Sequence, residues 1–367
     1  MRILYVTTIG ATMEFFAPLI RQLLDAGHQV DMAANISERD VPDCYRRWGC
    51  QVHPIACARS PLASGNRKAI CQIRKLVKSG KYDIVHCHTP IAALCTRLAC
   101  RDAAKWGTRV FYTAHGFHFY RGAPMKNWLV YYPAEWFCAH VTDVLITINR
   151  EDYALARRRM KAKQVVLVPG VGVDLARFCP DLAAGAQVRS ALGIPARAKL
   201  LLSVGELNEN KNHSLVIRAL AALADPNIHY VVAGIGDQTQ TLQNLARKLQ
   251  VADRVHLLGY RVDVPAFYNA ADVFVQPSYR EGLPVSLVEA MASGLPCAVS
   301  RIRGNTDLID ETGGALFAPD SVADCCRALQ TLLSCDTTAM AHRNRETVKE
   351  LDISLINRRM KELYETV

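Results

Sequence analysis

The sequence predicts an α/β protein built from two doubly wound domains, each a parallel sheet covered by helices on both faces. At 367 residues the chain is about twice the usual length of one domain. Short β-rich runs alternate with helical runs along both halves. The segment Pro169-Gly170-Val171-Gly172, rich in helix breakers, separates the halves. We therefore expect one domain over 1–172, a second over 173–350 facing it across a cleft, and a C-terminal helix over 351–367 that packs back toward the first.

Each element is predicted from hydrophobic periodicity. In the first half we expect a helix over 15–26 and strands over 3–8, 29–33, 83–87, 110–113, 144–147 and 165–168. In the second half we expect strands over 199–204, 229–233, 255–257, 273–276 and 296–300, with helices over 213–224, 239–249, 264–270 and 285–292. Ligands of such Rossmann-like domains sit at the carboxyl ends of the strands. The loops that follow the strands are therefore the candidate site.

Charge and cysteine content narrow the class of protein. Residues 1–170 hold 24 Lys and Arg against 12 Asp and Glu, whereas 171–367 hold 20 against 22. This asymmetry favours a polyanionic partner for the first half, or serves solubility alone. Thirteen cysteines, an odd number with no Cys-x-x-Cys pair, indicate reduced thiols. No apolar run approaches the roughly 20 residues of a spanning helix, and Met1 leads directly into a strand, so we expect a cytoplasmic protein.

The triplet His86-Cys87-His88 resembles a metal-binding cluster. Strand alternation, however, sends the two histidines to one face of a sheet and the cysteine to the other. We therefore predict no metal site here.

The most informative stretch runs from Gln276 to Met291 and is predicted as strand, loop and helix. Pro284 lies near the first helical turn, where its missing N–H does no harm. The free amides of that turn suit the diphosphate of an activated sugar. Glu281 and Glu289 could both accept hydrogen bonds from the hydroxyls of such a ligand. The alternative is an ordinary amphipathic helix with solvated glutamates.

A second strand, loop and helix unit follows residue 203. Gly205 permits close backbone approach, and Lys211 can neutralise phosphate. The alternative for Lys211 is a loop lysine in water.

With these motifs the chain resembles the family 4 glycosyltransferases, which have the two-domain GT-B fold, over nearly all of its length. The resemblance implies that Glu281 lies by the transferred sugar, that Glu289 holds the nucleotide ribose and that Lys211 binds the diphosphate. It also implies backbone contacts to sugar and phosphate from a four-residue loop: Gly282, Leu283, Pro284 and Val285. Gly205, Asn208 and Arg280 belong to the same expected donor site.

One position departs from the family pattern. The family commonly has arginine directly after the glycine of the first C-domain strand, whereas this chain has Glu206. A carboxylate cannot supply that charge. Either Lys211 and the helix amides suffice, or Arg280, Arg301 or Arg303 takes the place of the missing arginine.

The first half also carries the resemblance. The segment Thr113 to His118 is similar to the one whose histidine touches the donor, which implies a catalytic role for His115. Gly10 matches the family's glycine-rich approach to donor and acceptor. The segment from Thr113 through Pro124 most resembles the branch that builds bacterial capsules and exopolysaccharides.

The resemblance therefore implies a retaining hexosyl- or N-acetylhexosaminyltransferase that moves a sugar from a nucleotide-sugar, UDP-linked in this branch, to a polyprenyl-diphosphate-linked or saccharide acceptor. No cofactor is expected. The chain has no Asp-x-Asp, so we assign charge stabilisation to Lys211, the helix amides and His115 rather than to a metal. A sugar-nucleotide epimerase of the same fold is the alternative. A nicotinamide dehydrogenase is disfavoured because Gly234-Ile235-Gly236 lacks the third glycine, and a nucleic-acid-binding module because no basic and aromatic RNA-binding motif is present.

An anionic membrane surface is a further expected partner. Residues 67–81 contain six cations and no acid, interleaved with apolar residues at helical spacing: Ile70, Ile73, Leu76 and Val77. Between Phe111 and Phe137 lie 10 of the 27 aromatic residues, a type enriched at membrane interfaces: among them Trp128, Tyr131, Tyr132 and Trp136. We therefore expect peripheral attachment at the inner face of the plasma membrane. The alternative is that both stretches pack on the sheet with their charges in water.

Overall fold

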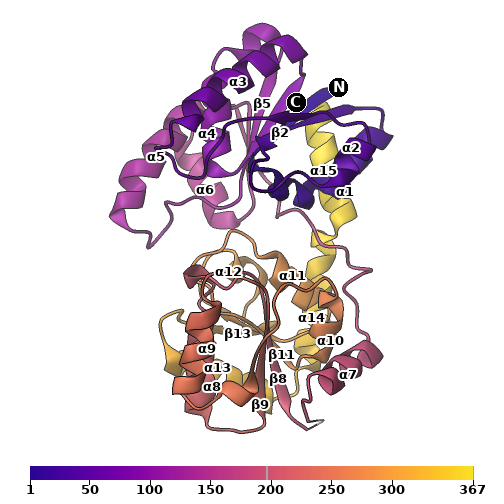
Figure 1. Cartoon of the computed structure of the whole chain (residues 1–367), viewed down its shortest axis with the longest axis vertical. Helices are drawn as coiled ribbons and strands as arrows, with labels where there is room; N and C mark the ends of the chain where they lie inside the picture. Colours follow the sequence, from indigo (N-terminus) through magenta and orange to yellow (C-terminus); the bar gives the residue numbers. More distant parts are fainter. Residues whose placement is uncertain (196, 367) are drawn as a thin grey trace. The chain divides into compact units, whose positions relative to one another are not determined.

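The computed structural model describes residues 1–195 and 197–366, so the last residue of the predicted C-terminal helix lies outside the described residues. The chain divides into two compact units. Unit 1 comprises residues 1–171 and the C-terminal segment from Ser354, and unit 2 comprises 172–353. Each unit has its own parallel sheet (Figure 1).

The sheet of unit 1 has seven strands in the order β3-β2-β1-β4-β5-β6-β7. Every pairing is parallel, as βαβ crossovers require. The strands are β1 (Arg2–Ile9), β2 (Gln29–Asn35), β3 (Val52–Pro54), β4 (Ile84–His88), β5 (Arg109–Ala114), β6 (Val144–Thr147) and β7 (Gln164–Leu167). The helices are α1 (Ala17–Asp25), α2 (Asp43–Arg47), α3 (Gly65–Gly80), α4 (Pro90–Ala99), α5 (Met125–Ala139), α6 (Arg150–Arg159) and α15 (Ile353–Thr366), with 3-10 helices η1 (Gly10–Phe16) and η2 (Ala103–Trp106).

Two apolar clusters cover the two faces of this sheet. On one face α3, α4, α5 and α6 pack on side chains such as Val85 and Tyr112. On the other face η1, α1 and α15 pack on alternate residues of the same strands, such as Ile84 and Phe111. Because both faces are covered, the central strands are buried throughout rather than alternating in exposure. The C-terminal helix α15 thus completes the core of unit 1.

The sheet of unit 2 has six parallel strands in the order β10-β9-β8-β11-β12-β13. The strands are β8 (Lys199–Val204), β9 (Ile228–Ala233), β10 (Val255–Leu257), β11 (Val273–Gln276), β12 (Cys297–Ser300) and β13 (Gly314–Phe317). The helices are α7 (Leu182–Ala191), α8 (His213–Leu223), α9 (Thr239–Lys248), α10 (Val264–Ala270), α11 (Val285–Ala292), α12 (Asn305–Leu308), α13 (Val322–Ser334) and α14 (Thr338–Val348), with 3-10 helices η3 (Glu209–Lys211), η4 (Ala252–Arg254) and η5 (Lys349–Leu351).

Both sheets contain a reversal of strand order. The chain runs outward from β1 to β3 and returns to β4 on the other side of β1, and β8 to β10 followed by β11 repeats this path. The crevice at such a switch point is where doubly wound sheets bind ligands. The relevant loops are those after β1 and β4 in unit 1, and those after β8 and β11 in unit 2.

The structure corrects several predicted elements. The helix predicted over 15–26 is α1 over Ala17–Asp25, and its first two predicted residues belong instead to the preceding 3-10 helix η1. Strands β3 and β13 were not predicted: β3 has only three residues, and β13 begins with Gly314, which resembles a turn. A glycine is required at that position because a Cβ there would lie 2.0 Å from the carbonyl oxygen of Cys297 on β12.

Candidate active site

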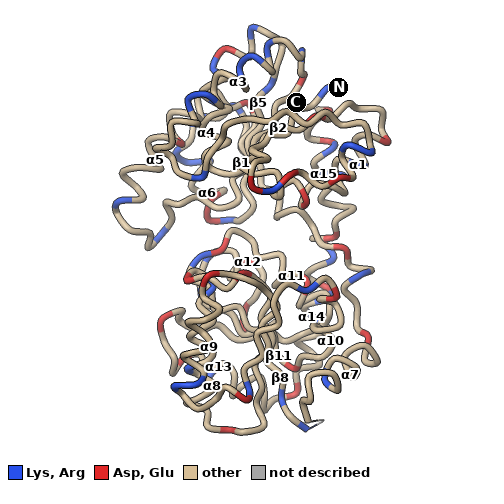
Figure 2. The backbone as a smooth tube through the Cα atoms, in the orientation of Figure 1, with Lys and Arg blue, Asp and Glu red and all other residues tan. Residues whose placement is uncertain are grey.

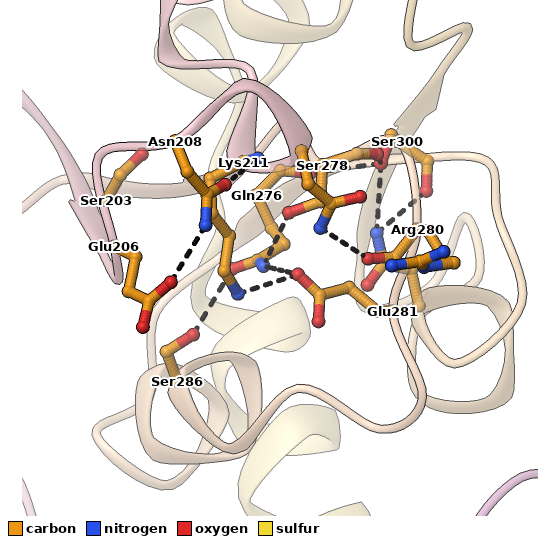
Figure 3. A network of polar contacts seen from close by, with 12 residues as sticks. Ser203, Glu206, Asn208, Lys211, Gln276, Ser278, Arg280, Glu281, Ser286 and Ser300 are labelled. Atoms are coloured by element: carbon orange, nitrogen blue, oxygen red, sulfur yellow. Dashed lines mark hydrogen bonds and ion pairs between the residues drawn. The ribbon is translucent and has the colours of Figure 1, made fainter. Parts of the chain in front are cut away.

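The predicted donor-site residues of unit 2 come from the two switch-point loops. Gly205 and Lys211 follow β8, while Glu281 follows β11, and these two strands are neighbours. Because β8 and β11 are parallel neighbours, their carboxyl ends lie at the same edge of the sheet, and both loops start there. Segments separated by 70 residues are thereby joined in one polar network (Figure 3).

Lys211 and Glu281 form an ion pair. The Lys211 Nζ donates to Glu281 Oε1 at 2.8 Å, and both side chains are largely buried. The lysine stem passes over Gly205, where an added Cβ would lie 3.4 Å from Lys211 Cε. An ammonium has three donors, so Lys211 can hold Glu281 and still donate to a ligand oxygen.

Gln276, the last residue of β11, joins Glu281 to α11. Its side-chain Nε2 donates to Glu281 Oε1 at 2.9 Å and lies 3.0 Å from Ser278 Oγ, while its Oε1 accepts from Ser286 Oγ at 3.3 Å. Gln276 is only 3% exposed. Figure 3 shows this amide between the glutamate and the first turn of α11. It therefore restricts the orientation of the Glu281 carboxylate.

The first turn of α11 begins directly after the Gly282-Leu283-Pro284 loop, with Val285 as its first residue. Its leading amides have no acceptor within the helix itself, which makes the turn a favourable place for an anion. Gly282 lies close to another loop, because a Cβ on Gly304 would come 2.4 Å from its carbonyl oxygen. The loop backbone is thus held in place by packing.

Glu289 lies one turn further along α11. Its Oε2 accepts a hydrogen bond from Tyr268 Oη at 2.7 Å, and Tyr268 belongs to α10. Burial raises the pKa of Glu289 to about 7, although the hydrogen bond from Tyr268 and the charge of Arg177 act in the opposite direction. This carboxyl group therefore changes its charge close to neutral pH.

The other loop residues fix the two segments to each other. Asn208 Oδ1 accepts from the backbone N–H of Lys211 at 3.0 Å, and its Nδ2 donates to Glu206 at 2.8 Å. Asn210 Nδ2 donates to the carbonyl oxygen of Arg280 at 2.9 Å. Glu206 is exposed, and its carboxylate accepts a hydrogen bond from the Asn208 amide. This loop stabilises itself without the arginine that is common in the family.

In unit 1, the predicted site residue His115 follows β5 and joins a cluster of histidines. His115 Nε2 lies 3.2 Å from His88 Nδ1, and the rings of His88 and His86 lie 4.1 Å apart. Cys87 points into the opposite core cluster, as strand alternation predicts. Burial lowers the pKa of His86 to about 3 and that of His88 well below its ordinary value, so both rings are neutral at pH 7.

The buried end of this cluster is connected to the C-terminal helix. His86 Nδ1 lies 2.6 Å from Tyr364 Oη on α15, and His86 Nε2 lies 2.8 Å from Thr113 Oγ1. Tyr364 in turn is bonded to Tyr5 Oη. A small cavity of about 30 Å³ adjoins the cluster, and His115 and His88 line it together with Phe16 and Asn357.

Close backbone packing explains why residue 10 is glycine. It starts η1 immediately after β1, and a Cβ there would lie 2.6 Å from the carbonyl oxygen of Arg39. This close backbone approach requires glycine whether or not a ligand binds nearby.

The structure thus joins Gly205, Asn208, Lys211 and Glu281 by direct contacts. Arg280 is tied to the loop after β8 by the hydrogen bond from Asn210 to its carbonyl oxygen, and Glu289 connects to the group through α11. His115 and Gly10 lie in the other unit. The residues that sequence reasoning missed are Gln276, Tyr268, Ser286, His86, His88 and Tyr364. The two histidines belong to the triplet that resembles a metal motif, and Gln276 and Ser286 lie in the informative stretch from Gln276 to Met291 but were given no role there. Tyr268 and Tyr364 give no sequence signal, because isolated polar residues in buried elements form no pattern.

Parts of the predicted basic helix and of the aromatic stretch pack inward on the core of unit 1. In α3 the four apolar residues pack inward on the core, and Arg74 forms an ion pair with Asp102 at 2.6 Å. Trp128, Tyr131 and Tyr132 also pack against the core rather than facing outward. Within residues 1–195 and 197–366, no helix is long and apolar enough to cross a membrane, and no group of three metal-binding side chains occurs.

Comparison with known proteins places this geometry in a family. A model described as glycosyl transferase 4-like domain matches residues 12–170, and one described as glycosyl transferases group 1 matches 186–350. The putative glycosyltransferase EpsD of Bacillus subtilis is 37% identical over 329 residues, which span 88% of this chain and 85% of that protein. A UDP-Gal:alpha-D-GlcNAc-diphosphoundecaprenol alpha-1,3-galactosyltransferase of Escherichia coli is 32% identical over 284 residues, 75% of this chain and 72% of that protein.

Solved structures agree on the fold. HepE of Anabaena, determined in complex with UDP and glucose, superposes with a TM-score of 0.83 at 18% identity and full coverage of both chains. Sucrose-phosphate synthase of Thermosynechococcus elongatus superposes with a TM-score of 0.82 at 21% identity, covering 99% of this chain and 98% of that one. None of these matches favours the epimerase alternative. The chain belongs to the family 4 glycosyltransferases of the GT-B fold.

Proposed function

We propose that the protein is a retaining glycosyltransferase that moves a hexose or N-acetylhexosamine from a UDP-sugar to a polyprenyl-diphosphate-linked saccharide during bacterial surface polysaccharide assembly. The observation that carries the proposal is the Lys211–Glu281 pair held at the switch point of unit 2, beside the first turn of α11. The Escherichia coli relative, whose name specifies UDP-galactose and a diphosphoundecaprenol acceptor, supports the donor and acceptor classes. The EpsD relative, named as a putative glycosyltransferase, supports sugar transfer as the reaction.

Each part of the site has a task in this reaction. Lys211 and the leading amides of α11 stabilise the negative charge that grows on the diphosphate as the bond to the sugar breaks. Glu281, oriented by Gln276, accepts hydrogen bonds from sugar hydroxyls. Glu289 accepts hydrogen bonds from the ribose, and His115 donates to the donor as a neutral imidazole. The leaving phosphate assists deprotonation of the acceptor on the same face of the sugar, so no enzyme nucleophile and no metal ion are needed.

The decisive experiment is product analysis with a panel of UDP-sugars and undecaprenyl-diphosphate-N-acetylglucosamine as acceptor. We expect release of UDP, an extended lipid-linked product with the donor's anomeric configuration by NMR, and turnover that survives EDTA. An inverted product would refute retention. Loss of activity in EDTA that manganese restores would refute metal independence. A changed sugar still attached to the nucleotide would indicate the epimerase alternative.

A further inference from the structure

His88, the last residue of β4, is a buried imidazole whose ring bonds to one other side chain. The residue is 2% exposed, and rings of Tyr5, Phe16 and His86 surround it with centroids 5.5, 4.2 and 4.1 Å away. Its Nδ1 lies 3.2 Å from His115 Nε2. Its Nε2 is buried and has no hydrogen-bond partner among the described residues. The polar contact of this ring is therefore directed at His115 alone.

The polar groups around His88 are engaged elsewhere. His86 uses both ring nitrogens, one with Tyr364 Oη and the other with Thr113 Oγ1. Tyr5 Oη is bonded to Tyr364 as well. The strands around the cluster, β1, β4, β5 and β6, contain no Asp or Glu, and Figure 2 accordingly shows no red along them. These strands thus lack a carboxylate to orient a histidine, and an imidazole is in that position instead.

The surroundings of His88 decide which of its nitrogens carries the proton. A neutral imidazole has one N–H and one lone pair. His88 lines the small cavity beside the cluster, mostly together with apolar side chains: Phe16, Leu19, Ile148, Val168 and Met360. Leaving a buried donor without an acceptor is costly, and among backbone groups orphaned donors are rarer than acceptors that lack a donor. The proton of His88 therefore belongs on Nδ1, where His115 Nε2 accepts it.

We propose that His88 is a positioning residue that holds His115 in its Nδ1-protonated tautomer, so that His115 presents Nδ1–H to the nucleotide-sugar. If His88 donates, His115 Nε2 is a lone-pair nitrogen and the proton of that ring is on Nδ1. With the opposite placement, His115 would give its one N–H to His88 and could not donate to a ligand. His115 also lines the cavity and keeps an accessible surface.

The proposal rests on the proposed function, in which His115 donates to the nucleotide-sugar as a neutral ring. It goes further because it names the nitrogen that donates and the residue that selects it.

The first test reads the proton directly and needs no substrate. In protein labelled with ¹⁵N in its histidines, long-range ¹H–¹⁵N correlation spectra at pH 7.5 distinguish the protonated from the bare nitrogen of each ring. We expect Nδ1–H in both His88 and His115, each ring being assigned by the signals that disappear in His88→Asn or His115→Asn. In His88→Leu the ring of His115 should lose this fixed tautomer. An Nε2-protonated His115 in the unchanged protein would overturn the proposal.

Three substitutions of His88 separate positioning from packing. Asn places an amide N–H near the position of Nδ1, Gln places it nearer to Nε2, and Leu fills the space without a donor. We expect His88→Asn to keep kcat within about threefold, and His88→Gln and His88→Leu to lower kcat about tenfold or more with KM within about twofold. His88→Leu should be as resistant to chemical denaturation as the unchanged protein, because it removes a buried polar atom that had no partner.

The matched control is His53→Leu, which removes a partly buried imidazole of β3 outside the cluster. This variant should leave kcat unchanged. If His88→Asn is as inactive as the folded His88→Leu, the ring does not act by donating to His115, and the proposal is wrong.

A double-mutant cycle shows whether His88 acts through His115. In the His115→Ala background, adding His88→Leu should lower kcat no further, because the group that His88 positions is already absent. Independent, additive losses would contradict the proposal. A His115→Ala enzyme with unchanged kcat would instead refute the role of His115 in the proposed function, whereas the tautomer spectra would still decide whether His88 sets the proton of that ring.

Discussion

The two switch points of this protein hold polar side chains in different ways. In unit 2 the loops after β8 and β11 carry opposite charges that satisfy each other, Lys211 and Glu281. In unit 1 the end of strand β4 and the residue after β5 carry imidazoles that burial keeps neutral, packed among aromatic rings. Burying a charge is costly unless it is paired, whereas a neutral ring needs only a hydrogen bond. The charged cluster is thus suited to a diphosphate, and the neutral one to a weaker donor contact.

The largest effect is expected from removing the charge in unit 2. Lys211→Ala removes the ammonium that we propose binds the diphosphate, and it leaves Glu281 without its ion-pair partner. We expect kcat/KM to fall by about 10²- to 10³-fold. Lys248→Ala, at an exposed position of α9, is the matched control. Steady-state kinetics and donor titration calorimetry measure the effect, and an unchanged Kd and kcat would remove Lys211 from the site.

In unit 1 the corresponding deletion is expected to affect stability. His86→Leu removes both bonds of the ring and leaves the buried Thr113 hydroxyl without its imidazole partner. We expect a loss of about 1–3 kcal/mol in the free energy of unfolding at pH 7.5. Chemical denaturation measures this loss, and a variant as stable as the wild type would contradict the assigned bonds.

The same variant carries a pH signature. The folded pKa of His86 is depressed to about 3 from an ordinary value of 6.5, so its contribution to stability is present above pH 6.5 and is lost as the pH falls below it. His86→Leu should therefore be less destabilising at pH 5 than at pH 7.5.

Within the charged cluster, the neutral amide of Gln276 orients the Glu281 carboxylate, and this role can be tested. Gln276→Met keeps the volume of the side chain but removes its bonds to Glu281 and Ser286. We expect kcat to fall about tenfold while KM stays within twofold, because the donor still binds but Glu281 is no longer oriented. Gln240→Met, at an exposed position of α9, is the control. A rise in KM alone would show that Gln276 acts on binding instead.

The pH dependence of donor affinity is expected to follow the charge of Glu289. Its carboxyl has a pKa raised to about 7 by burial, and hydroxyls of the donor would bind the ionised form. Only that form is competent, so donor affinity should rise about tenfold from pH 6 to pH 8. Glu289→Gln should flatten this dependence and bind less tightly at pH 8. Titration calorimetry across this range decides, and a flat wild-type profile would refute the role.

The linked effect on folding has the opposite sign to that of His86. The folded protein holds the Glu289 proton more tightly than the unfolded chain, so this group's contribution to stability decreases as the pH rises from about 4.5 to 7. Glu289→Gln should accordingly gain stability relative to the wild type at pH 8 more than at pH 5.

The smallest effect is expected at Glu206. This exposed residue bonds to Asn208 and carries no phosphate-binding charge, so Glu206→Ala should change donor affinity by less than about twofold. Donor titration measures it. A strong loss would assign this carboxylate to the ligand, and a strong gain would show that it repels the diphosphate.

The sequence by itself determined the fold class, most strands, the α11 boundary and the loops that carry the proposed site. These follow from local features: apolar periodicity specifies the elements, and the Gly, Pro, Glu and Lys residues of the two loops follow strands that the pattern identifies. Helix α11 begins at Val285 and ends at Ala292, as predicted.

Only the tertiary structure decided which of these groups satisfy one another. The Lys211–Glu281 pair joins segments 70 residues apart, and Tyr364 reaches His86 across 278 positions. Gln276 and Tyr268 owe their contacts to burial between such segments, which no local pattern encodes. The outward side of α5 is a case of the same kind. Apolar residues surround most of this helix, so periodicity could not identify its buried face, which the buried ion pair between Glu135 of α5 and Arg97 of α4 fixes instead.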